Sequence, residues 1–257
     1  MATKLTCDEL IAEGEAVPTE GWDFSWFEGR ATEERPRWGY ARAVGERLGS
    51  SRAVLDIQTG GGEVTAAALR ACARLPTTVA ATESWPPNVQ IARQNLAPFG
   101  GTVTEVAEDA DLPFADDSFD LIVSRHPIET VWPEVARVLA PGGSYFSQQV
   151  GPGSNRELTD FMMGPQPVGG SRTAKRAAAE ARAEGLAVTD LREQALRVEF
   201  FDVAAVVYFL RKVIWTVPGF TVEGYREQLR RMCEHIAANG SFVAYSQRFL
   251  IEARKPS

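Results

Sequence analysis

The sequence contains few of the side chains that bind metal ions. Its 257 residues include three cysteines and two histidines. Cys7, Cys72 and Cys233 lie far apart and form no C-x-x-C pair, so they show no zinc-ligand spacing and we expect no metal site. Scattered thiols of odd number also imply no disulfide framework, and they suit a reducing compartment.

Long apolar runs are missing as well. No stretch approaches the roughly 20 apolar residues of a membrane-spanning helix, so we expect no membrane segment. The first ten residues include Asp8 and Glu9 and lack a long apolar core, which argues against a secretory signal. These absences predict a cytoplasmic protein.

Positive charge is in deficit. The chain has 27 Lys and Arg against 34 Asp and Glu, a net charge of −7 that repels polyanions and disfavours a nucleic-acid partner. A hydrophobic content of 44% is enough for one sizeable core in a chain of this length. With no internal repeat or low-complexity tract, we expect one domain, as a monomer or a homodimer.

A glycine turn organises the chain. The apolar run Ala53–Ile57, which contains Asp56, predicts a buried parallel strand. Gly60-Gly61-Gly62 follows, and an alanine-rich helix former begins at Glu63. Such a turn brings backbone N–H groups and the positive end of a helix toward a ligand, although a glycine cluster alone also fits an ordinary tight turn.

A carboxylate stands where a nucleotide-binding fold needs one. Glu83 closes the next apolar run, Thr78–Thr82, roughly 20 residues after the glycines. At the tip of the neighbouring strand it can accept hydrogen bonds from ribose hydroxyls. Two kinds of nucleotide cofactor are bound in this geometry.

The spacing of the glycines separates the two. The dinucleotide pattern G-x-G-x-x-G fits poorly, because Gln58 and Thr65 stand at its outer glycine positions. The pattern acidic-x-G-x-G-x-G of class I S-adenosylmethionine (SAM) methyltransferases fits better, through Asp56, Gly60 and Gly62. Gln58 replaces its first glycine, so the turn is expected to differ locally.

Three further motifs carry the same resemblance. Residues 103–114 resemble that family's third strand and its "D-A-x-x-L-P-F" loop, and Phe119–Arg125 resembles the fourth strand. Residues 134–143 are similar to the "E-x-x-R-V-L-x-P-G-G" helix end and turn. From Arg52 to about Val150 the chain therefore resembles the class I SAM-dependent methyltransferases, of the kind called methyltransferase type 11.

The resemblance implies a fold, a cofactor and its contacts. Strands alternate with helices, and we expect an α/β, doubly wound Rossmann-like sheet of seven strands, mostly parallel with an antiparallel last strand and helices on both faces. The cofactor would be S-adenosyl-L-methionine, and Asp109 would bind the adenine amino group. The expected cofactor-binding residues are Asp56, Thr59, Gly60, Gly61, Gly62, Glu83, Ser84, Asp109, Ala110, Ser124 and Arg125.

The chain is expected to divide into a core that binds the cofactor and segments around it. Residues 1–50 would form a helical and aromatic lid, 51–153 the cofactor-binding core, 154–184 a substrate-cap insertion and 185–257 the rest of the sheet. Dense aromatics either pack on the domain or wall a substrate pocket. The predicted substrate contacts are Trp22, Trp26, Phe27 and Phe161.

The predicted reaction is methyl transfer to a small-molecule acceptor, with oxygen favoured over nitrogen or carbon and specialised metabolism as the setting. His126 follows the strand Phe119–Arg125 and is the candidate general base, unless it only hydrogen-bonds the loop backbone. Two alternatives stay open. One is a SAM-binding protein that transfers no methyl group, and the other is a nicotinamide dinucleotide-binding oxidoreductase.

Overall fold

The computed structural model of the chain describes residues 5–19 and 24–257. It contains two compact units. The chain enters each unit more than once. The first unit holds Met1–Arg35, Pro152–Gly169 and Ala195–Gln247, and the second holds Pro36–Gly151, Gly170–Gln194 and Arg248–Ser257.

The second unit is built on a mostly parallel sheet, which confirms the predicted fold. In the described chain the strand order is β1-β7-β8-β6-β5-β2-β3-β4, eight strands where the sequence predicted seven. The last strand, β8, is antiparallel to β6, as expected. The bounds are β2 (Ala53–Asp56), β3 (Thr78–Glu83), β4 (Thr102–Glu105), β5 (Phe119–Arg125), β6 (Leu139–Val150), β7 (Ala187–Phe200) and β8 (Phe242–Arg254).

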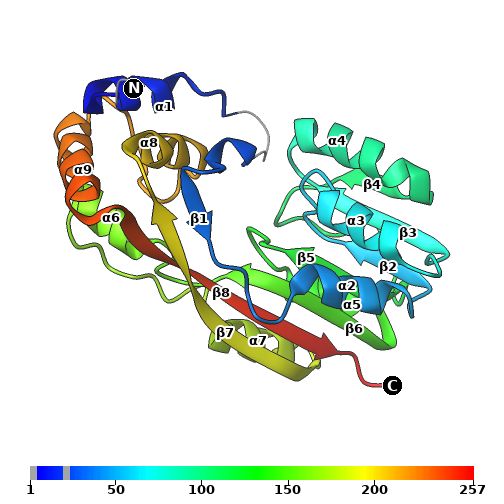
Figure 1. Ribbon diagram of the computed structural model, residues 1–257. Coiled ribbons are helices and arrows are strands. Elements are labelled where there is room, and N and C mark those ends of the chain that lie inside the picture. The colour runs from blue at the N-terminus through cyan, green and yellow to red at the C-terminus, as the bar shows by residue number, and fades with distance from the viewer. Residues whose placement is uncertain (1–4, 20–23) are drawn as a thin grey trace. The chain divides into compact units, whose positions relative to one another are not determined.

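Helices cover both faces of this sheet. Val54 packs into one core beneath α2, α3 and α4, whereas the next residue, Leu55, packs into a second core beneath α5 and α7. Successive side chains of a strand point to opposite faces, and both faces here are apolar. Figure 1 shows α3 and α4 alongside β2, β3 and β4. The helices are α2 (Tyr40–Leu48), α3 (Glu63–Ala71), α4 (Pro86–Leu96), η2 (Ala97–Phe99), α5 (Trp132–Val138) and α7 (Ala174–Ala183).

The first unit is mainly helical. Its strand β1 pairs antiparallel with β7, from Ala31 opposite Phe200 to Glu33 opposite Val198. Helix α1 lies so close to α8 that a Cβ at Gly14 would meet the Ala204 carbonyl oxygen, so only glycine fits there. The elements are α1 (Cys7–Ala16), η1 (Ser25–Phe27), β1 (Ala31–Glu33), α6 (Arg156–Met163), α8 (Val203–Lys212) and α9 (Arg226–Asn239).

A disulfide in the first unit corrects the sequence prediction. Cys7 at the start of α1 and Cys233 in α9 are bonded across 226 residues of sequence, and Cys72 is free. The prediction of no disulfide was wrong because the two helices meet only in the fold. Structural disulfides belong to oxidising compartments, so the cysteines no longer support a reducing one.

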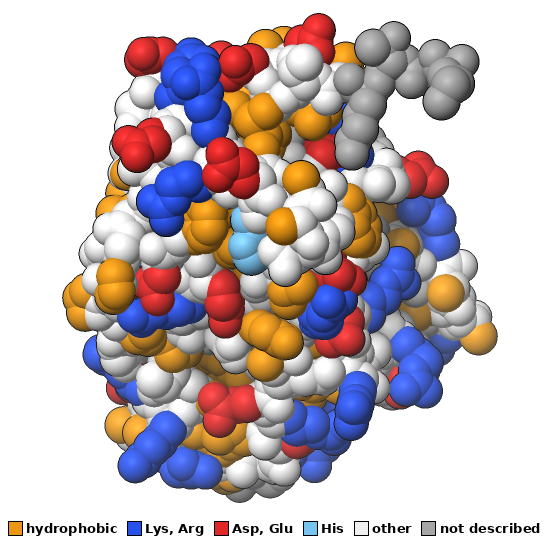
Figure 2. Space-filling view, turned by 60° about the vertical axis from the view of Figure 1, so that its left-hand side comes forward, with side chains coloured by type: hydrophobic (Ala, Val, Ile, Leu, Met, Phe, Trp, Pro, Cys, Tyr) orange, Lys and Arg blue, Asp and Glu red, His pale blue; other side chains and the backbone are white. Residues whose placement is uncertain are grey.

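The surface carries charges of both signs. On the face drawn in Figure 2, acidic and basic side chains are interspersed with apolar ones. Within residues 5–19 and 24–257, no helix has the length and apolar character needed to cross a membrane.

Candidate functional site

Glu83 lies at the carboxyl end of β3 with both of its oxygens oriented by the backbone. Gly60 N donates to Oε2 at 2.8 Å, and Trp85 N donates to Oε1 at 3.1 Å. The residue is only 7% exposed. A buried carboxylate held this way keeps further lone pairs for hydroxyl donors, which is what a ribose presents.

The glycine turn leaves open space beside this carboxylate. Gly60 has a φ of +64°, and apart from its two chain neighbours no heavy atom of the described chain lies within 4 Å of the place where its Cβ would be. Gly62 has a φ of +75° and serves a different purpose, because its Cβ would lie 3.4 Å from the Cα of Ala92 in α4. Gly60 therefore leaves the side of the turn open, and Gly62 lets α3 pack on α4.

Asp56 supports the turn from beneath. Its Oδ2 accepts hydrogen bonds of 2.5 Å from both the Thr59 and the Thr65 hydroxyls. Burial raises the pKa of Asp56 to about 6, and the neighbouring Glu83 charge adds to this. In the structure, Asp56 and Thr59 thus act on each other within the turn.

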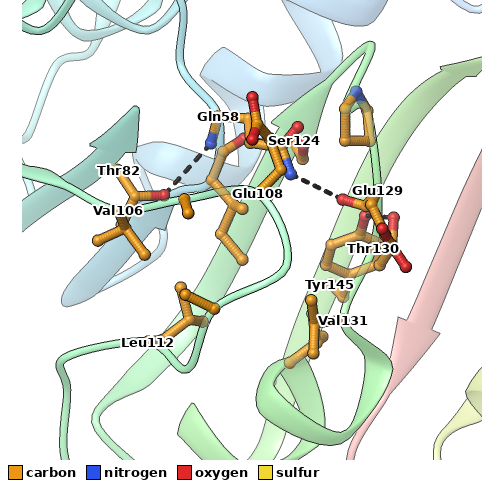
Figure 3. Close-up of a pocket in the computed structure, with 15 residues that line it drawn as sticks. Gln58, Thr82, Val106, Glu108, Leu112, Ser124, Glu129, Thr130, Val131 and Tyr145 are labelled. Carbon is orange, nitrogen blue, oxygen red and sulfur yellow. Dashed lines mark hydrogen bonds between the residues drawn. The ribbon is translucent and has the colours of Figure 1, made fainter. Parts of the chain in front are cut away.

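A narrow pocket opens next to the turn, at the carboxyl ends of β2, β3 and β5 (Figure 3). Its empty volume, including solvent at the mouth, is about 410 Å³. Strand ends and loops meet here because parallel strands leave their ligand crevice at this edge. The lining residues are Ile57, Gln58, Thr82, Val106, Ala107, Glu108, Ala110, Leu112, Ser124, Pro127, Glu129, Thr130, Val131, Val135 and Tyr145.

Some of the predicted cofactor-binding residues line this pocket, and others do not. Ala110 and Ser124 line it, whereas Asp109 is exposed and does not. Its neighbour Glu108 lines the pocket instead and accepts a hydrogen bond of 2.6 Å from the Ser84 hydroxyl. The sequence analysis passed over Glu108, although it stands directly before Asp109 in the same loop.

Gly61 and Arg125 do not line this pocket. The carbonyl oxygen of Gly61 accepts from the side-chain amide of Asn95 at 2.8 Å, which ties the turn to α4. Arg125 is exposed at the end of β5.

His126 is half-buried just beyond β5, in a left-handed conformation with a φ of +57°. Its Nε2 lies 2.8 Å from Gln148 Nε2, and Gln148 Oε1 accepts a hydrogen bond of 2.8 Å from Trp38 Nε1. Burial lowers the pKa of His126 well below its usual value, and nearby positive charges lower it further. Those charges are Arg125, Arg248 and Arg172. The imidazole is therefore neutral at pH 7.

The pocket also has a polar wall that the sequence analysis missed. The Tyr145 hydroxyl lies 3.5 Å from Thr130 Oγ1, and the side-chain amide of Gln149 donates to both of these oxygens. Burial raises the pKa of Tyr145, so the phenol stays protonated at neutral pH. Polar residues at the end of a predicted strand, here Gln148-Gln149, were the available signal.

The predicted substrate contacts pack within the first unit. Trp26 and Phe27 lie with ring centroids 5.1 and 5.0 Å from Tyr208 of α8. Phe161 packs against Phe242 at 5.4 Å. Trp22 lies outside the described residues. For the described rings, these contacts support packing on the protein rather than a substrate-pocket wall.

Part of the chain resembles known proteins in sequence. Residues 55–147 match the family model described as "Methyltransferase domain". One curated protein is similar, the ubiquinone/menaquinone biosynthesis C-methyltransferase UbiE of Geotalea daltonii. It is 38% identical over 101 residues, which cover 35% of this chain and 42% of that protein. The chain thus matches less than half the length of this relative.

Solved structures share the fold at low sequence identity. A putative methyltransferase from Bacillus halodurans is 17% identical with a TM-score of 0.58, and the match covers 84% of this chain and 98% of that one. The [4+2]-cyclase SpnF is 18% identical with a TM-score of 0.50, over 84% of this chain and 80% of that one. The fold therefore occurs in more than one kind of protein.

Proposed function

We propose that this chain, whose residues 55–147 match the methyltransferase-domain model, is a class I S-adenosyl-L-methionine-dependent methyltransferase that transfers a methyl group to a small-molecule acceptor. Its cofactor is S-adenosyl-L-methionine. The observation that carries the proposal is the buried Glu83 carboxylate, held by Gly60 N beside the open side of the turn. That arrangement suits a ribose diol and the chain attached to it.

The residues of the site fit the cofactor part by part. Glu83 would accept from the ribose hydroxyls, and the space over Gly60 would take the amino-acid end near the N-terminus of α3. Glu108, Ser84 and Ala110 would surround the base, with Asp109 at the exposed rim. Asp56 contributes through the turn that it supports.

Methyl transfer requires the protein mainly to position the two reactants. The bound sulfonium supplies a methyl group that is already activated for displacement. The chain has to hold the acceptor in line with that methyl group and keep water out. The apolar residues of the pocket, such as Val106, Leu112 and Val131, suit a dry site.

An oxygen acceptor also has to lose a proton, and we assign this step to His126. The imidazole is neutral, so it can accept one. Its Nε2 faces the Gln148 amide, and the acceptor hydroxyl would take the place of that amide as the donor. A carbon acceptor is the second candidate, favoured by the C-methyltransferase named among the relatives, and it needs a proton removed as well.

Two measurements test the function. Titration calorimetry should show binding of S-adenosyl-L-methionine and S-adenosylhomocysteine and none of NAD; binding of NAD alone would make the chain an oxidoreductase. Incubation of a phenol and hydroxy-acid library with methyl-¹³C cofactor should then yield labelled products. The ¹³C shift of the label distinguishes a methoxy group from a methyl on carbon. Cofactor binding with no labelled product from any class would favour the non-methylating alternative.

The role of His126 is tested separately. His126→Ala should lower kcat by roughly 10²–10⁴-fold, the usual effect of a positioned base, and leave cofactor affinity nearly unchanged. His235→Ala is the matched control, because His235 packs against Phe161 and Phe242 in the first unit. Full activity of His126→Ala would show that His126 is not the base and that the reaction depends on alignment of the acceptor alone.

A further inference from the structure

Gln58 stands where the family pattern has its first glycine, and it adopts a conformation suited to glycine. Its φ is +54°, in the left-handed region that L side chains enter at a cost. Gln58 N donates to Thr82 Oγ1 at 3.3 Å, so the strained backbone is tied to β3. A side chain retained at such a position calls for a compensating contact.

The side-chain amide makes two such contacts, both with the loop after β5. Ile128 N donates to Gln58 Oε1 at 2.6 Å, and Gln58 Nε2 donates to the Glu129 carbonyl oxygen at 2.7 Å. The amide thus pairs with two successive residues in the way that a neighbouring strand would. Figure 3 shows the Gln58 side chain reaching across the pocket to Glu129.

This segment, the β5 loop (residues 126–130), has no regular secondary structure. Its polar backbone groups therefore depend on side chains. Besides Gln58, Arg172 Nη2 donates to the carbonyl oxygens of Pro127 and Ile128 at 2.7 and 3.0 Å. His126 N donates to the Gln148 carbonyl oxygen at 2.7 Å. The loop is held at both ends and from two sides.

The contacts of Gln58 are compatible with a bound cofactor. Its amide is directed at the β5 loop, and the space next to Gly60 stays open. The same loop supplies Pro127, Glu129 and Thr130 to the pocket wall. A single side chain therefore connects the glycine turn to the loop that contains His126.

We infer that Gln58 is a positioning residue that clamps the β5 loop to the glycine turn, so that the loop keeps one conformation while cofactor and acceptor bind. Seating the acceptor is the part of this role that rests on the proposed function. The clamp itself does not depend on methyl transfer.

Amide hydrogen exchange of the full chain tests the clamp directly. In Gln58→Ala the Ile128 amide should exchange about tenfold faster or more, because two hydrogen bonds are lost. Gln58→Gly should speed exchange equally while leaving the unfolding midpoint unchanged or higher, since glycine accepts the positive φ. Gln90→Ala, which removes an exposed glutamine of α4, is the matched control and should leave Ile128 protection unchanged. Unchanged exchange at Ile128 in both Gln58 variants would overturn the inference.

Cofactor titration adds a second readout. S-adenosyl-L-methionine should leave the protection of Ile128 in the wild type equal or greater. Loss of that protection would show that the cofactor displaces the amide, which contradicts a permanent clamp. The dissociation constant of S-adenosyl-L-methionine should change less than about threefold in Gln58→Gly. Loss of cofactor binding with the loop still protected would make Gln58 a cofactor contact instead.

The experiments test the clamp and the proposed function independently of each other. If the wild type binds no S-adenosyl-L-methionine, the function is wrong, and the exchange rates of the Gln58 variants still decide the clamp. Once an acceptor is known, Gln58→Gly should raise its KM or lower kcat at unchanged cofactor affinity. Arg172→Met should add to the effect on exchange, because it removes the second tether of the same loop.

Discussion

Gln148 fixes the tautomer of His126. The indole N–H of Trp38 can only donate, so the oxygen of the Gln148 amide faces Trp38 and its NH₂ group faces the imidazole. Nε2 of His126 is therefore the acceptor of this 2.8 Å contact, and the proton of the neutral ring resides on Nδ1. Nε2 is therefore the unprotonated nitrogen of the ring, and in the structure the Gln148 amide donates to it.

Gln148→Glu should raise the pKa of His126. Burial and neighbouring arginines lower that pKa in the wild type, and a carboxylate in contact with the ring opposes both. The expected rise is roughly 1–3 units, as for an opposite charge within a few ångströms. The measurement is a pH titration of the ring proton signals by NMR, with His235→Gln used to assign the two histidines. An unmoved pKa would mean that the contact does not persist in solution.

Asp56→Asn should change how stability depends on pH. Because folding raises the pKa of Asp56 from near 3.8 to about 6, its stabilising contribution is full below pH 4 and is lost as pH rises through 6. Asparagine keeps an acceptor oxygen for Thr59 and Thr65 and does not ionise. The free energy of unfolding of the variant relative to wild type should therefore increase by about 2 kcal/mol between pH 4 and pH 7. Urea denaturation at several pH values measures it, and a constant difference would contradict the raised pKa.

Glu83→Gln should weaken cofactor binding by roughly 1.5–3 kcal/mol, the range for hydrogen bonds to a charged group. The change keeps the shape of the side chain and removes its charge and part of its accepting capacity. Glu105→Gln is the matched control, because Glu105 lies opposite Glu83 in the sheet register and is exposed. Calorimetry with S-adenosylhomocysteine gives both dissociation constants. Equal dissociation constants for Glu83→Gln and Glu105→Gln would show that Glu83 does not bind the ribose.

The sequence predicted what depends on local pattern. The predicted strand Phe119–Arg125 agrees with β5 residue for residue, and the last strand is antiparallel as predicted. The turn at Gly60 and the carboxylate at Glu83 were recognisable because backbone geometry dictates their spacing. These features need no knowledge of distant partners.

What the sequence did not predict depends on distant partners. Strand β1 has three residues and exists because it pairs with β7. Helix α6 lies within residues 154–184, for which only a substrate-cap insertion was predicted, without this helix. The Gln58 amide and the Gln148 amide act on residues 70 and 22 positions away. Side chains that can serve many roles reveal the one in use only after folding.

The disulfide gives the last prediction. Cys7 and Cys233 join α1 to α9, and the 226-residue separation makes the closed loop very long. A cross-link of that length removes much entropy from the unfolded chain, and native disulfides are typically worth about 2–4 kcal/mol. The Cys7→Ser, Cys233→Ser double variant should therefore unfold at lower temperature than wild type.

Reduction provides the internal check. A thiol reductant should lower the unfolding temperature of the wild type to that of the double variant and leave the double variant unchanged. Cys72→Ser is the control, because Cys72 is free, and it should keep the response to reductant. Alkylation of denatured, unreduced wild type should label Cys72 alone. Labelling of all three cysteines would show reduced thiols, and α1 would then be held to α9 by packing rather than by a covalent bond.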